Sequence, residues 1–269
     1  MKTNINLGLA AFALLVTVPF FACNPPANNA GDGSNVAAED SSLSVVPVAD
    51  SKQFPGAELS IVSITSEKVD ADSAKLTVKY DVKNYTLTEH TSDSNAHHMA
   101  NSAQGQHIHF ILDNKPYAAL YEPEHTAMVK LNSEHYLMSF LSRSYHESIK
   151  EPGASVLKHF KVDENGKVVE LDIPAEPALF YSRPKGEYVG DDAKNILLDF
   201  YLVNTKLDDG NKVEAKINDT TITLDKWGPY EIQNAPKGEL NVTLTLVDKD
   251  GNKLSGENTS VTRKVTLTD

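Results

Sequence analysis

The chain has 269 residues, 40% of them hydrophobic, which is enough for one large domain or two small ones after removal of processing segments. Its formal net charge is −12 at pH 7. Binding to nucleic acid needs a basic face that neutralises phosphates, so this charge argues against a nucleic-acid partner.

The N-terminus has the pattern of an export signal. A charged start is followed by an apolar run at residues 7–21 and by the only cysteine, Cys23. This pattern resembles a bacterial lipoprotein signal, which implies removal of residues 1–22 and lipidation of Cys23. The resemblance, with Asn24 after the cysteine, implies a cell-envelope protein held to the membrane by its lipid, with sorting to the outer membrane. An ordinary secretory signal or a transmembrane anchor is the alternative, although the run is short for a membrane span.

Residues 23–55 predict a flexible linker after the lipidated cysteine. The segment is rich in Asn, Ala, Gly, Ser and Asp and poor in large apolar residues, so it should not bury enough surface to fold. Once Cys23 is lipidated, no thiol is left for a disulfide or for a thiolate metal site.

The remaining chain predicts short strands throughout, because apolar and polar residues alternate between turn residues. The first set of expected strands comprises residues 58–65, 75–82, 107–113, 117–121, 126–131, 136–141 and 155–162. A second set begins at about residue 178 and includes the segments "ILLDFYLV", "KVEAKIN", "TITL", "LNVTLTLV" and "VTRKVTL". No segment after the signal shows the period of a helix.

The two sets of strands form an internal repeat. Alternating apolar positions at residues 76–84 align with residues 196–204, and residues 108–112 align with residues 213–217. Seven short antiparallel strands in roughly a hundred residues are typical of an immunoglobulin-like β-sandwich. We therefore predict an all-β fold, with two such sandwiches in tandem at residues 56–165 and 166–269 after the signal and the linker.

Histidine distinguishes the first copy from the second. All nine histidines lie between His90 and His159. In the second copy, Lys212 and Glu214 stand where the first has His107 and His109, so the strand itself does not require imidazole at those positions.

Strand geometry predicts where the histidines gather. His107 and His109 lie on the face opposite to Ile108 and Phe110, roughly 7 Å apart along the strand. Tracing the chain up and down the sandwich brings further histidine-bearing loops to the same end. The histidines expected at this pole are His90, His97, His98, His107, His109, His125 and His146, whereas His135 and His159 are expected to be structural or surface residues.

Imidazole ligands without thiolate suit copper or zinc, and copper stands highest in the divalent affinity order. Because Met99 lies in the histidine-rich loop and thioether favours Cu(I), we predict copper before zinc. The expected ligands are His107, His109 and His146, with His98 or His125 as a fourth. The alternative for the strand pair is an outward pair of histidines used only for hydrogen bonding.

One resemblance points to an enzyme. The segment "QHIHF" is similar to the H-x-H strand of copper–zinc superoxide dismutases, which also use a β-sandwich. This resemblance implies a metal-dependent enzyme of that type.

A longer resemblance points to a binding module. The segments "GQHIHFILDNKPYAALY" and "LSRSYHESIK" resemble bacterial lipoproteins that are loosely labelled phosphopeptide-binding. The resemblance implies a peptide or protein partner. In physical terms, Arg143, Ser144, His146 and Lys150 crowd one loop, where they could hold a phosphate or a carboxylate.

Motifs for catalysis are absent from the sequence. It has no G-x-S-x-G elbow, no H-E-x-x-H helix, no P-loop and no cysteine nucleophile. We therefore predict no catalytic residues and favour a non-catalytic protein that binds, senses or delivers a transition metal. The peptide-binding module and the dismutase-like enzyme remain the alternatives.

Overall fold

A computed structural model describes residues 42–207 and 209–269. The predicted signal peptide and Cys23 lie outside the described residues, as does the first part of the predicted linker. All the described residues belong to a single unit of the chain. In the described ranges, no helix is long and apolar enough to cross a membrane.

Strands account for nearly all of the regular structure, and the only helices among the described residues are two 3₁₀ turns, η1 (Ser94–His97) and η2 (Gly190–Ala193). The strands are β1 (Ser44–Pro47), β2 (Glu58–Lys68), β3 (Ser73–Lys83), β4 (His107–Leu112), β5 (Ala118–Leu120), β6 (Glu124–Lys130), β7 (Ser133–Ser142), β8 (Ser155–Val162), β9 (Val168–Leu171), β10 (Ala178–Arg183), β11 (Gly186–Val189), β12 (Asn195–Val203), β13 (Lys212–Ile217), β14 (Thr220–Leu224), β15 (Tyr230–Gln233), β16 (Gly238–Val247) and β17 (Ser260–Thr268).

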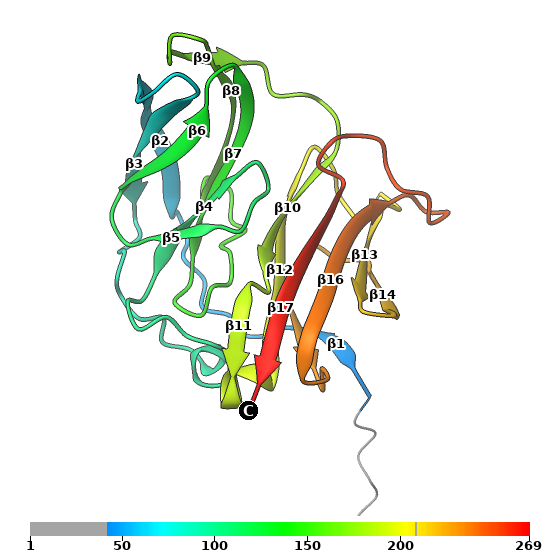
Figure 1. Ribbon diagram of the computed structural model, residues 1–269. Coiled ribbons are helices and arrows are strands. Elements are labelled where there is room, and N and C mark those ends of the chain that lie inside the picture. The colour runs from blue at the N-terminus through cyan, green and yellow to red at the C-terminus, as the bar shows by residue number, and fades with distance from the viewer. Residues whose placement is uncertain (1–41, 208) are drawn as a thin grey trace, which may run out of the picture. The chain divides into compact units, whose positions relative to one another are not determined.

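The first sandwich consists of two antiparallel sheets, with strand orders β2-β3-β6 and β5-β4-β7-β8-β9 (Figure 1). In immunoglobulin lettering, β2, β3 and β6 correspond to strands A, B and E, and β4, β7 and β8 to strands C, F and G. Its strands run to Leu171, because β9 pairs with β8, so this sandwich extends past the predicted boundary at residue 165.

The second sandwich repeats this plan, with strand orders β1-β15-β12-β10 and β11-β17-β16-β13-β14. The aligned repeat positions fall on equivalent strands, since β12 takes the place of β3 and β13 the place of β4. One addition is β11, which pairs in parallel with β17. The predicted all-β fold of two tandem immunoglobulin-like sandwiches is confirmed.

Each sandwich closes over its own apolar core, as the alternation predicts. In the first, Leu76 and Val78 of β3 pack with Ile108 and Phe110 of β4. In the second, the equivalent strands supply the same positions, for example Leu198 and Val213. Strand alternation therefore leaves the opposite face of β4 free for other contacts.

Strand β1 contradicts the flexible linker predicted for residues 23–55. Residues 44–47 add an antiparallel strand to the second sandwich, where Val45 pairs with Ile232 of β15. Val45 also packs against the core of that sandwich. Composition averaged over the whole segment hid this short apolar stretch, which gains both a sheet edge and buried surface.

The outer face of the β4 sheet packs against the second sandwich. A cluster of buried side chains joins Ile111 and Phe140 to Phe180 of β10 and Tyr201 of β12. The Phe140 and Tyr201 rings stack with their centroids 5.1 Å apart. The two sandwiches thus share an apolar junction, and the histidines on this face of β4 lie beside it.

Candidate metal centre

Strand β4 directs His107 and His109 to the junction between the sandwiches. Both side chains are fully buried, each with 0% exposure. The sequence predicted the correct face of the strand for both residues. That face is not exposed to solvent at the end of the sandwich, however, because β10 covers it. Ser182 of β10 places its Oγ 3.0 Å from Nδ1 of His109. Ser182 sits where a register shift interrupts the β10–β12 pairing, a type of irregularity that re-aims side chains.

His146 comes to the same place from the turn between β7 and β8. Its amide donates to the carbonyl of Arg143, and its φ of +73° lies in the left-handed region. In the second copy the equivalent turn has the same hydrogen bond, from Gly251 to Asp248, and Gly251 has a φ of +83°. The first copy therefore holds a histidine where the second uses the residue best suited to this conformation. Non-glycine residues in such conformations cluster at functional sites.

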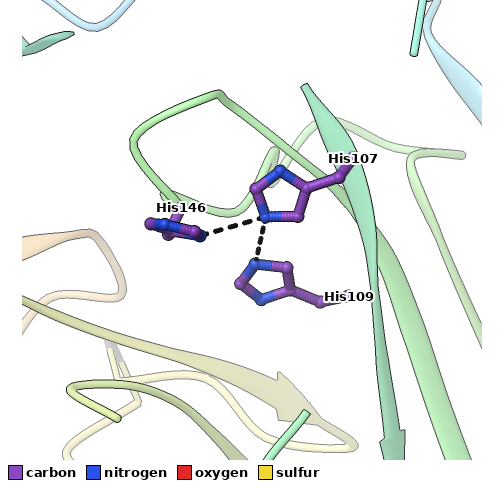
Figure 2. A group of neighbouring side chains, drawn as sticks. All are labelled: His107, His109 and His146. Atoms are coloured by element: carbon purple, nitrogen blue, oxygen red, sulfur yellow. Dashed lines mark hydrogen bonds between the residues drawn. The ribbon is translucent and has the colours of Figure 1, made fainter. Parts of the chain in front are cut away.

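The three imidazoles face one another across a small space (Figure 2). Nε2 of His107 lies 3.0 Å from Nε2 of His109 and 3.1 Å from Nδ1 of His146. All three nitrogens lie within 4.8 Å of one another. Nitrogens that share a metal ion at about 2.0–2.1 Å are themselves separated by roughly 3 Å, so the two spacings from His107 suit one ion, and the nitrogens of His109 and His146 would have to draw closer together to share it.

Neighbouring groups leave the facing nitrogens of His107 and His109 available, whereas the facing nitrogen of His146 also lies 3.2 Å from the Tyr117 hydroxyl. Nδ1 of His107 donates to the carbonyl of Gly105 at 2.8 Å, which leaves a lone pair on its Nε2. Nδ1 of His109 meets the Ser182 hydroxyl, which can accept its proton and leave Nε2 free as well. Metal-binding histidines usually fix their second nitrogen in this way, through a carbonyl or a polar side chain.

Loss of solvent around the three imidazoles favours their neutral form. Loss of solvent lowers the pKa of His107 to about 4. The hydrogen bond to Gly105 acts in the opposite direction but is the smaller effect. Loss of solvent also places the pKa values of His109 and His146 well below the ordinary value. The cations of Arg183 and Lys185 lower all three pKa values further. Neutral imidazole is the form that binds metal.

A network around the β7–β8 turn holds His146 in place. Arg143 and Glu147 form a buried ion pair at 2.9 Å. The amide and hydroxyl of Ser148 donate to the buried carboxylate of Asp199 on β12, at 3.2 and 3.0 Å. Lys150 donates to the same carboxylate. The turn is thereby tied to both sandwiches.

The same network occupies the donors of the predicted phosphate-binding loop. The guanidinium of Arg143 donates to the carbonyls of Lys52 and Ser148, in addition to its ion pair. Ser144 is fully buried, and its hydroxyl accepts from the amide of Thr91. Arg143, Ser144 and Lys150 therefore serve the fold and are not presented together to solvent.

Three predicted ligands lie elsewhere. His98 is exposed and pairs with Glu231 of β15 at 3.2 Å. Met99 is buried in a separate cluster with Tyr145 and Leu197. His125 lies on β6, in the opposing sheet, where its ring packs against Phe110 with centroids 4.7 Å apart. The expectation that His98 or His125 completes the ligand set is corrected, and the thioether argument for copper does not hold.

The other histidines have separate surroundings. His90 and His97 are exposed. His135 contacts Asp113 at 2.9 Å, and His159 contacts Glu134 at 2.6 Å. The convergence of seven histidines predicted from the loops thus reduces to the group of His107, His109 and His146.

Sequence reasoning missed four residues around this group. The Tyr117 ring stacks on His109 with centroids 3.6 Å apart, and its hydroxyl lies 3.2 Å from Nδ1 of His146. Its place could have been inferred, because β5 pairs Ala119 with His109, and Tyr117 is two residues away on the same face. Ser182, Arg183 and Lys185 gave no such signal, since they arrive through the packing of the second sandwich.

Comparisons with known proteins do not assign a family. No protein-family model and no curated protein matches the chain. The fibronectin(III)-like modules of CbhA from Clostridium thermocellum are 12% identical, with a TM-score of 0.27, over 78% of this chain and 94% of that one. The extracellular domain of the putative hybrid two-component system BT3049 from B. thetaiotaomicron is 10% identical, also with a TM-score of 0.27. The match covers 78% of this chain but about a third (32%) of that one, and scores this low support no functional relationship.

Proposed function

We propose that this protein binds one transition-metal ion through His107, His109 and His146, and that its role is non-catalytic binding, sensing or delivery. The observation that carries the proposal is a set of three imidazoles, two fully buried and one half-buried, whose nitrogens face one another from two separate segments. Copper is the first candidate, because it stands highest in the affinity order for nitrogen ligands, and zinc is the second.

The second sandwich strengthens the proposal as an internal control. The second sandwich keeps the strand, the turn and the hydrogen bond within the turn, but it has lysine, glutamate and glycine at the three ligand positions. Two imidazoles buried side by side lose hydration without gaining an ion pair, which costs stability. A metal ion that binds to their lone pairs would explain why the first sandwich bears this cost and the second does not.

The proposal includes a place in the cell. The sequence pattern around Cys23 supports an envelope lipoprotein anchored by its lipid in the outer membrane. Metabolic labelling with a radioactive fatty acid tests this, since a Cys23→Ala variant should take up no label.

Metal binding is tested on the purified full-length protein. Elemental analysis after expression in its native host identifies the ion, and titrations with Cu(II) and Zn(II) give stoichiometry and affinity. The variant with both His107→Gln and His109→Gln should bind no ion at the site, whereas His97→Gln, an exposed control, should bind one. Stoichiometric high-affinity metal in the double variant would contradict the assignment.

The peptide-binding alternative is tested in parallel with a phosphopeptide at two pH values. Anion capture by protonated histidine should strengthen near pH 6, whereas metal binding should weaken. Because the Arg143 donors already have partners, we expect no phosphopeptide binding.

A further inference from the structure

The candidate metal centre has three protein ligands and one side that is not closed by a fourth. No other histidine, cysteine or carboxylate among the described residues belongs to the group. A four-coordinate ion held by three histidines keeps one position for an exogenous ligand. The identity of that ligand depends on what borders the open side.

A pocket of about 350 Å³ borders the group on the side of His146. Tyr117, Arg183 and Lys185 line it together with His146. A space of this size takes a small molecule. His146 is thus the proposed ligand that a solvent-borne molecule in this pocket would meet.

The charges near the histidines are positive. Arg183 is buried, and its Nε has no hydrogen-bond partner in the part of the chain that the structure describes. The Lys185 ammonium lies 4.3 Å from the centroid of the Tyr117 ring and donates one of its three hydrogens to the Tyr117 carbonyl at 2.7 Å, which leaves two for another acceptor. Glu187 and Asp192 also line the pocket, but both are exposed, so solvent screens them.

Two cations beside a metal ion repel it unless an anion lies between them. Arginine and lysine bind oxygen anions through charge-assisted hydrogen bonds, and the Tyr117 hydroxyl can donate another. We propose that a small oxygen anion, a carboxylate or an inorganic phosphate, enters this pocket and becomes the fourth metal ligand, with Arg183 and Lys185 selecting it by charge. This inference rests on the proposed metal site.

The test uses full-length protein loaded with Cu(II), whose copper content is measured first. Sodium azide is then titrated as a spectroscopic probe, because azide bound to Cu(II) gives a charge-transfer band. Wild-type protein should give a saturable band at one azide per copper, and sodium acetate or inorganic phosphate should displace the azide.

Variants separate the contribution of the charge. Lys185→Met should weaken azide binding about tenfold or more, as expected for a lost charge-assisted hydrogen bond, and should still hold one copper. Lys185→Arg should restore binding, and Lys253→Met, an exposed lysine of the same sandwich, should leave it unchanged.

The outcomes distinguish this inference from the proposed function. Protein that binds no copper rejects both. Protein that binds copper but gives no azide band, or whose azide is displaced by neither acetate nor phosphate, rejects only the anion ligand. Equal azide affinity in wild type and Lys185→Met, or loss of copper from that variant, rejects the selecting role of Lys185.

Discussion

Replacing His146 by glycine should remove a metal ligand at almost no cost to the fold. The residue has a φ of +73°, and the equivalent turn of the second copy places Gly251 there with a φ of +83°. The second copy therefore shows that the turn forms with glycine. Few ligand positions offer a substitution that the same chain has already used.

Opposing contributions set the expected change in stability. A non-glycine residue in the left-handed region costs about 1–2 kcal/mol, which the His146→Gly variant recovers. Glycine adds conformational freedom to the unfolded chain, at a cost of about 0.5–1 kcal/mol. The variant also loses the contacts of the imidazole with His107 and Tyr117. The free energy of unfolding of the metal-free protein should thus change by no more than about 1 kcal/mol.

Metal affinity should respond far more strongly. Changing a residue that only orients a ligand typically costs 10–100-fold in affinity, so losing one of three ligands should cost more than about 100-fold. Urea denaturation of the metal-free protein measures the first quantity, and competition titration with a copper chelator measures the second. His146→Asn is the control for the backbone, since asparagine tolerates the left-handed region.

Two results would refute this reasoning. Unchanged copper affinity in His146→Gly would show that the imidazole is not a ligand. A loss of stability above about 3 kcal/mol would show that His146 holds the turn together, so that its unusual backbone conformation needs no metal to explain it.

Three further predictions concern the surroundings of the site. The folded metal-free protein takes up a proton on His107 only near pH 4, because burial lowers its pKa, whereas the unfolded chain does so near the ordinary value of 6.5. His107 should therefore contribute about 3 kcal/mol to the loss of stability as the pH falls from 6.5 to 4, to which His109 and His146 add. Denaturation at several pH values measures the loss; an equally steep fall in His107→Gln would contradict this contribution. Gly105→Ala should destabilise the fold and weaken metal binding, because the new Cβ would lie 2.5 Å from the Thr88 carbonyl oxygen and because Gly105 has a φ of +84°. Unchanged thermal unfolding and an unchanged copper titration would count against this prediction. Ser182→Ala should keep the fold and lower copper affinity 10–100-fold by freeing the second nitrogen of His109, and unchanged affinity in the same titration would exclude that positioning role.

The fold followed from the sequence wherever apolar residues alternate with polar residues along a strand. In β4, the alternation of Ile108 and Phe110 with histidine identified the strand, its inner face and its counterpart in the second copy. In the second sandwich, the short strands β1, β11 and β15 were missed, because four residues carry too little alternation to stand out. Their pairing becomes visible only when the second sandwich is assembled.

The site was predictable as far as local geometry determines it. His107 and His109 share a face because they are two residues apart. The second copy has other residues at these positions, which indicated that the strand does not need histidine to fold. His125 was misplaced because proximity to one end of a sandwich does not specify a sheet, and β6 belongs to the sheet opposite β4. Ser182 and Arg183 depend on how two sandwiches pack, which strand patterns do not encode.

The packing of the second sandwich should influence metal binding at the proposed centre. All three proposed ligands, His107, His109 and His146, come from the first sandwich, whereas the second supplies Ser182, which orients His109, and Arg183, which adds charge. The Ser182 contact should make a metal ion bind more tightly while the two sandwiches are packed together than while they are apart. The extra free energy of metal binding in the packed arrangement then stabilises the packed arrangement by an equal free energy. Metal should therefore tighten the junction between the sandwiches, and loosening the junction should release the metal, which is the behaviour that sensing or delivery requires.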